Sequence, residues 1–136
     1  MSKKKYDTWS YDTVKLDDWG YDCIRVLIGD NVPNALKLAA KEYDHIKKTR
    51  KSMTKRDRNT HADAVFIESD YGFFFVFSDE TTIEIIAHEC FHATLSFMKA
   101  KGMKLNKGSE EAYAYLNGVL VERVNKIWKR HKKALK

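Results

Sequence analysis

Residues 64–77 read Ala-Val-Phe-Ile-Glu-Ser-Asp-Tyr-Gly-Phe-Phe-Phe-Val-Phe and give the clearest structural signal in the chain. Two runs, Ala64–Glu68 and Phe73–Phe77, are rich in β-branched and aromatic residues, and Ser-Asp-Tyr-Gly separates them. Such runs on either side of a turn sequence are typical of paired strands. Gly72 can adopt the positive φ that a tight turn requires. The stretch therefore predicts a β-hairpin.

Two helices are expected after this hairpin. Ser78 or Asp79 is a candidate N-cap for the first helix, which should run to about Lys101 and stop at Gly102. The second should begin near Ser109 and continue towards the C-terminus. Its apolar residues recur at spacings of three and four, which predicts one buried face: Tyr113, Leu116, Leu120, Val124 and Ile127.

A strand and a helix are expected before the hairpin. Tyr21–Ile28 predicts a strand, with Ile24, Val26 and Ile28 on one face and Cys23, Arg25 and Leu27 on the other. Pro33 suits the first turn of a helix that reaches about Arg50, and residues 51–61 are expected to be loop. The aromatic and polar segment Tyr6–Asp18 is compatible with a short strand. This order predicts an α+β fold, with helices packed on a small antiparallel or mixed sheet, in one domain over residues 1–136.

Composition excludes several classes of protein. The chain is 43% hydrophobic and 32% charged, which favours a packed core over intrinsic disorder. Its longest uninterrupted apolar runs, Phe73–Phe77 and Ala112–Leu116, are far shorter than the roughly 20 residues that span a bilayer. The N-terminal sequence shows no signal-peptide pattern, and two cysteines make no disulfide framework. We therefore expect a cytoplasmic protein without a membrane partner.

Basic residues are unevenly distributed. The net charge is +6, and the excess lies in three clusters, at Lys3–Lys5, Lys47–Arg58 and Lys126–Lys136. Such clusters could bind the phosphates of a nucleic acid in a salt-dependent way. We favour the simpler interpretation that they are solvated helix ends and a loop, because Lys and Arg are favoured near helix C-termini and no recognition motif accompanies the charge.

The segment His88-Glu89-Cys90-Phe91-His92 carries the chemistry. It falls within the first helix after the hairpin, where positions i and i+4 share a face, so His88 and His92 can reach one Zn²⁺ ion. Glu89 is turned aside from that line and can act as the general base on a metal-activated water. Cys90 lies nearly opposite the two histidines and is expected in the core. The buried side should comprise Ile83, Ile86, Ala87, Cys90, Phe91, Thr94 and Phe97.

A catalytic zinc site needs a third protein ligand and an open fourth position. A third histidine three turns along is absent, because Met98 stands at that place. The last helix offers Glu110 and Glu111 in its first turn, and Glu111 is favoured. Small residues on its face, Ala114 and Gly118, would allow two antiparallel helices to approach closely. His61 and His131 are alternatives in a loop and in the basic tail.

His88–His92 and the later segment Glu110-Glu111-Ala112-Tyr113-Ala114-Tyr115-Leu116 together resemble the gluzincin type of zinc metallopeptidase. They are also similar to small phage and prophage proteins described as metallopeptidases. The resemblance implies a zincin-like core, a glutamate ligand from the second helix, and hydrolysis of a peptide or protein substrate. It also implies that the strand before the motif helix, Phe73–Phe77, edges the substrate cleft. Large gluzincins have a substantial C-terminal domain that walls this cleft, and we expect none within residues 1–136.

The alternative hypothesis is a basic module that binds nucleic acid or protein, with a structural or vestigial metal site. The lysine and arginine excess is its motive. It predicts binding that weakens steeply with salt and does not depend on Glu89.

Overall fold

The computed structural model describes residues 9–16 and 21–134, which form an α+β fold. A four-stranded mixed sheet has the order β1-β2-β4-β3. Its strands are β1 (Trp9–Leu16), β2 (Tyr21–Gly29), β3 (Ala64–Ser69) and β4 (Gly72–Ser78). β2 and β4 run parallel, while β1 and β3 are the antiparallel outer strands.

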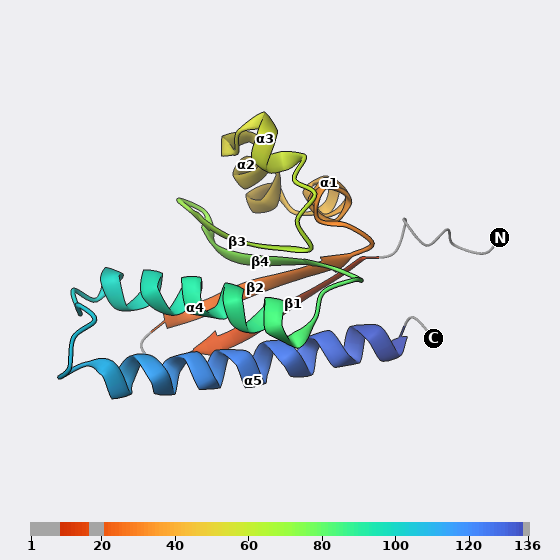
Figure 1. Ribbon diagram of the computed structural model, residues 1–136. Helices are drawn as coiled ribbons and strands as arrows, with labels where there is room; N and C mark the ends of the chain where they lie inside the picture. The colour runs from red at the N-terminus through yellow and green to blue at the C-terminus, as the bar shows by residue number, and fades with distance from the viewer. Residues whose placement is uncertain (1–8, 17–20, 135–136) are drawn as a thin grey trace.

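Helices cover both faces of this sheet (Figure 1). One face carries α1 (Val32–Glu42), α2 (Asp44–Ser52) and the short α3 (Lys55–Arg58). The other carries two long antiparallel helices, α4 (Ile83–Ala100) and α5 (Glu110–Ala134). No helix in the described part of the chain is long and apolar enough to cross a membrane.

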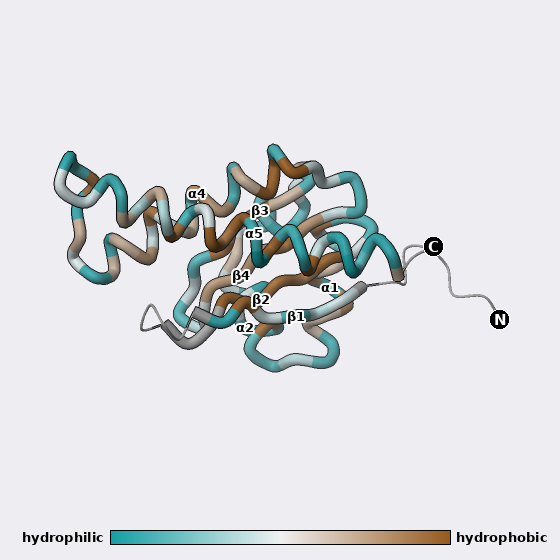
Figure 2. Tube along the Cα trace, turned by 90° about the horizontal axis from the view of Figure 1, so that it is seen from below, coloured by the Kyte–Doolittle hydropathy of each residue, from teal (hydrophilic) through white to brown (hydrophobic). Residues whose placement is uncertain are grey.

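The sheet separates two hydrophobic cores. Ile24, Val26 and Ile28 of β2 pack in the core that contains α4 and α5, whereas Leu27 packs with α1. The predicted alternation of β2 is therefore confirmed for the side chains described, whereas the side chain of Cys23 lies outside them. The predicted apolar stripe of the last helix is confirmed as well. Seen from the α5 side, the central strands are the most hydrophobic part of the trace and the last turns of α5 are hydrophilic (Figure 2).

Several predicted boundaries need correction. The expected helix from Pro33 to Arg50 is two helices, because Tyr43 is extended (φ −122°, ψ 116°) where its ring stacks on Tyr11. Residues 51–61 are not all loop, since they include α3, which Thr54 caps. Thr82, and not Ser78 or Asp79, caps α4. Ser78 instead continues β4 opposite Gly29 of β2.

The hairpin forms as predicted, with Gly72 at φ 127°, but its second strand lies inside the sheet. The chain returns from β2 through α1–α3, and β4 then pairs between β2 and β3. All four residues of Phe74–Phe77 are buried. The expectation that Phe73–Phe77 edges a cleft is therefore wrong, and β3 is the outer strand beside α4.

Candidate metal centre

Helix α4 fixes the two predicted histidine ligands. The Thr82 side chain accepts a hydrogen bond from the Ile85 amide and starts the helix. One side of α4 is anchored in the core by Ile86, Cys90, Ala93 and Phe97, all with about 1% exposure or less. His88 and His92 lie on the opposite side of the helix and are exposed. A packed helix thus presents two imidazoles to solvent.

The two imidazoles are close enough to share one ion. His88 Nε2 and His92 Nε2 lie 3.2 Å apart, and the ring planes meet at 74°. Two nitrogens bound to one tetrahedral Zn²⁺ at about 2.0–2.1 Å would be about 3.3–3.4 Å apart. The same distance also allows a hydrogen bond between two neutral imidazoles. The side chains therefore already have the spacing that a shared metal ion requires.

Glu89 completes the cluster from the side that faces β3. Ligand atoms of His88, Glu89 and His92 all lie within 4.8 Å of one another. Partial burial raises the pKa of the Glu89 carboxyl, and the two histidines and a backbone hydrogen bond from Phe66 oppose that rise. Phe66 belongs to β3, so the sheet edge helps to orient this carboxylate.

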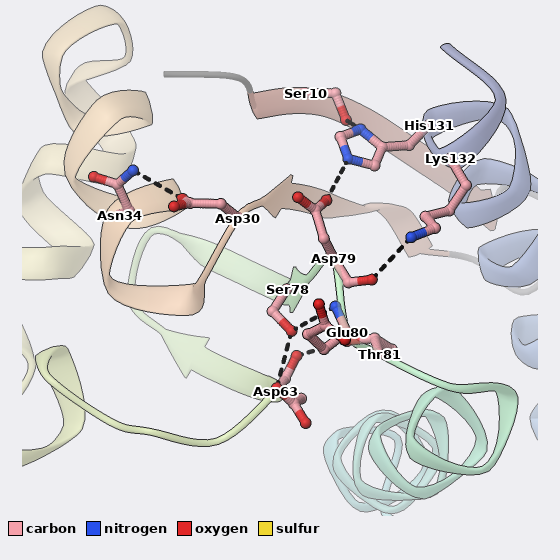
Figure 3. A network of polar contacts seen from close by, with 10 residues as sticks. All are labelled: Ser10, Asp30, Asn34, Asp63, Ser78, Asp79, Glu80, Thr81, His131 and Lys132. Carbon is pink, nitrogen blue, oxygen red and sulfur yellow. Dashed lines mark hydrogen bonds and ion pairs between the residues drawn. The ribbon is translucent and has the colours of Figure 1, made fainter. Parts of the chain in front are cut away.

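A cavity of about 400 Å³ adjoins the cluster; it is lined by Ala62, Asp63, Ala64, Glu84, Ile85, His88 and Glu89. Its wall on the β3 side is held by hydrogen bonds. Asp63 Oδ1 accepts from Ser78 Oγ at 3.1 Å, and the Asp63 carbonyl accepts from Thr81 Oγ1 at 2.6 Å (Figure 3). Glu84 lies one helical turn before His88 on the same side of α4. Two further carboxylates, Asp63 and Glu84, therefore line the same cavity as His88.

The structure does not bring Glu111 to this cluster. Glu111 is exposed, and it lies on the opposite side of α5 from the buried residues Leu116 and Leu120. Gly118 does not touch α4, because no atom lies within 4 Å of the place that its Cβ would take, whereas Ala114 borders a hollow that Phe91 of α4 also lines. Glu110 lines a separate hollow with Phe91. A metal-binding role for Glu111 stays a prediction.

The two alternative histidines also lie apart from the cluster. His61 lines another pocket, with Arg56 and Asp57 of α3. His131 is buried, and its Nε2 lies 3.0 Å from Asp79 Oδ1. Neither belongs to the His88-Glu89-His92 group.

The core side of α4 is partly as expected. Cys90 is fully buried, and burial raises the pKa of its thiol to about 12. Ile83 and Phe91, expected to be buried, are 43% and 46% exposed. Phe91 lies about 100° around the helix from Cys90, at the margin of the buried face. Near the start of α5, the Tyr113 hydroxyl donates to the Met103 carbonyl.

Comparisons with protein-family models, with curated proteins and with solved structures found no match. The likeness to metallopeptidases therefore depends on the His-Glu-His group itself and on the helix that carries it. The ligand atoms of this group lie close enough together to hold one metal ion, and the fold that carries them is α+β.

Proposed function

We propose that the protein is a zinc-dependent hydrolase, and more specifically a small zincin-like metallopeptidase of the gluzincin type. One observation carries the proposal, namely the 3.2 Å between His88 Nε2 and His92 Nε2 with the Glu89 carboxylate beside them. Bound Zn²⁺ would lower the pKa of water and polarise a substrate carbonyl. The arrangement of the three side chains matches the needs of that chemistry.

Glu89 would act as the general base. Its carboxylate lies near both imidazoles, but on a different side of α4 from the row that the two histidines form. It can therefore accept a proton from a water molecule at the site. The same carboxyl can then donate that proton to the leaving amine. The backbone of Phe66, whose hydrogen bond opposes the rise in the Glu89 pKa, would help to hold the carboxylate between these two steps.

The edge of the sheet favours an extended peptide as the substrate. Within the described sheet β3 pairs with β4 on one side only, so its other edge is unpaired except where the Phe66 backbone bonds Glu89. An unpaired strand edge can add a peptide by main-chain hydrogen bonding. Such a peptide would pass directly beside the histidine pair, because β3 runs along α4.

The third ligand belongs to the proposal as well. Glu111 is the ligand that the sequence predicts. Glu84 is a carboxylate of α4 that lines the same cavity as His88, and Asp63, which also lines it, already accepts a hydrogen bond from Ser78. Zinc affinity should be measured by competition with a chromogenic chelator in Glu84→Ala and Glu111→Ala. The variant that loses zinc affinity identifies the third ligand, because removing a group that coordinates the ion weakens binding far more than removing a distant charge.

The function is tested with two substitutions and one control. His88→Ala should abolish stoichiometric zinc binding, measured by elemental analysis of protein purified without chelator. Glu89→Gln should retain zinc but lose hydrolysis of an unfolded protein substrate such as casein, because an amide cannot accept the proton. His61→Ala, an exposed histidine outside the cluster, should change neither. Folded wild-type protein that binds no zinc would refute the proposal.

A further inference from the structure

A second hollow lies at the other edge of the sheet, away from the metal centre. It has a volume of about 850 Å³ and runs between the outer strand β1 and helix α5. Its lining is Thr13, Val14, Lys15, Arg123, Lys126, Ile127, Lys129 and Arg130. We call it the β1–α5 groove. Since β1 and β3 are opposite edges of the sheet, this groove is separate from the His88-Glu89-His92 cluster.

Positive charge dominates the groove. Five of its eight lining residues are Lys or Arg, and none is acidic. Two acids next to it neutralise part of this charge, since Arg130 pairs with Asp12 and Lys126 with Glu122, both at 3.1 Å. These pairs are largely solvent-exposed, so they compete weakly with another anion. A net positive potential remains along this side of α5.

The cations follow the helix axis in a row. Arg123, Lys126 and Arg130 recur at spacings of three and four on α5, and the exposed Lys133 extends the row. The row is about 15 Å long, from a rise of about 1.5 Å per residue. A nucleic-acid duplex presents about four phosphates per strand over that length. The spacing therefore suits a repeating phosphate chain better than a single small anion.

The rest of the lining indicates how the chain would be bound. Among the described residues no aromatic ring lines the groove, so none of them would stack on unpaired bases. None of the large apolar side chains exposed in the described residues lines it either, and a membrane-binding surface would present such residues. We propose that the β1–α5 groove binds the phosphate backbone of a nucleic-acid duplex without reading its sequence.

The test compares two variants with equal charge changes. Lys126→Glu/Lys129→Glu alters exposed residues of the groove, and Lys47→Glu/Lys51→Glu alters exposed residues of α2 on the opposite face of the sheet. Binding to labelled 20-base-pair DNA and RNA duplexes of two unrelated sequences is followed by fluorescence anisotropy between 50 and 300 mM salt. Circular dichroism and thermal unfolding verify that each variant is folded.

The groove variant should bind at least about 50-fold more weakly near 0.1 M salt. The plot of log K against log salt should become less steep by about two, because each phosphate contact that is lost contributes about 0.9 to the steepness of the slope. The α2 variant should stay within about threefold of wild type, and Lys126→Arg/Lys129→Arg should retain binding. Glu89→Gln should also bind as wild type does, which separates this proposal from the proposed hydrolase.

Three results would overturn the proposal. The first is equal losses in the two charge-reversal variants, since the effect would then follow net charge and not the groove. The second is wild-type protein that binds neither duplex at 50 mM salt. The third is tighter binding to polyglutamate or to phosphatidylserine vesicles than to the duplexes, which would assign the groove to an acidic protein or to a lipid surface.

Discussion

Removal of His131 should destabilise the protein strongly, because it would leave the Asp79 carboxylate buried without a partner. The two side chains are 6% and 4% exposed, and His131 Nε2 lies 3.0 Å from Asp79 Oδ1. Ser10 Oγ lies 2.9 Å from the other ring nitrogen (Figure 3). Asp79 Oδ2 is buried and has no hydrogen-bond partner among the described residues. The carboxylate therefore depends on this single imidazole.

The magnitude follows from that dependence. Breaking a buried pair by removing one partner costs about 3–5 kcal/mol, and we expect a loss in this range for His131→Ala. Asp79→Ala should cost less, about 1–3 kcal/mol, because it leaves only an unsatisfied imidazole N–H. The double variant should lose less unfolding free energy than the two single variants lose together. The reason is that the second substitution removes a buried group that the first has left without a hydrogen-bond partner.

Urea unfolding followed by circular dichroism measures all three free energies, and Lys133→Ala is the control. Lys133 is an exposed neighbour on α5, and its loss should change stability by less than about 0.5 kcal/mol. In a thermal scan, His131→Ala should lower Tm by roughly 10–20 °C. A loss below about 1 kcal/mol for His131→Ala, or strict additivity in the cycle, would show that the pair contributes nothing specific.

Three further predictions test other parts of the structure. Gly72→Ala should lower the free energy of unfolding in urea by about 1–3 kcal/mol, because φ is 127° and the new Cβ would lie 2.5 Å from an Arg25 guanidinium nitrogen, which would have to move. The control Gly118→Ala, in open space on α5, should not destabilise the protein. Cys90 should resist iodoacetamide at pH 8 until the protein is unfolded, because its thiol is buried with a raised pKa; rapid native labelling would contradict its burial. Burial and Arg25 lower the pKa of His45, so the unfolded state takes up a proton at a higher pH than the folded state does, and the protein should lose stability as the pH falls below about 6.5. This loss should be smaller in His45→Gln, which cannot take up the proton. Identical stability–pH profiles for the two proteins would show that His45 does not cause the loss.

The local parts of the fold could be predicted from sequence, and the parts that depend on distant contacts could not. Alternation in β2 and the apolar stripe of α5 are properties of neighbouring residues, and both are confirmed. The break at Tyr43 depends on stacking against Tyr11, which lies far away in the chain. The central position of β4 could, however, have been predicted from its own sequence. An uninterrupted apolar run such as Phe73–Phe77 is typical of a strand buried on both faces.

In the candidate site, too, the part that depends on neighbouring residues could be predicted and the part that depends on helix packing could not. The i, i+4 spacing of His88 and His92 is local to one helix, and a single regular helix is sufficient to bring their Nε2 atoms to 3.2 Å. A third ligand must come from the packing of α4 on its neighbours, which fixes the rotation of each helix. The stripe of Leu116 and Leu120 already determined that rotation, because it must face the core and it places Glu111 on the solvent side. The small residues beside Glu111 do not by themselves place it near α4, since a helix face can be small simply because nothing packs against it, and its role as a ligand stays a prediction. For a carboxylate sought near a helical histidine pair, the apolar stripe of the second helix should be placed first and ligands chosen only from its flanks.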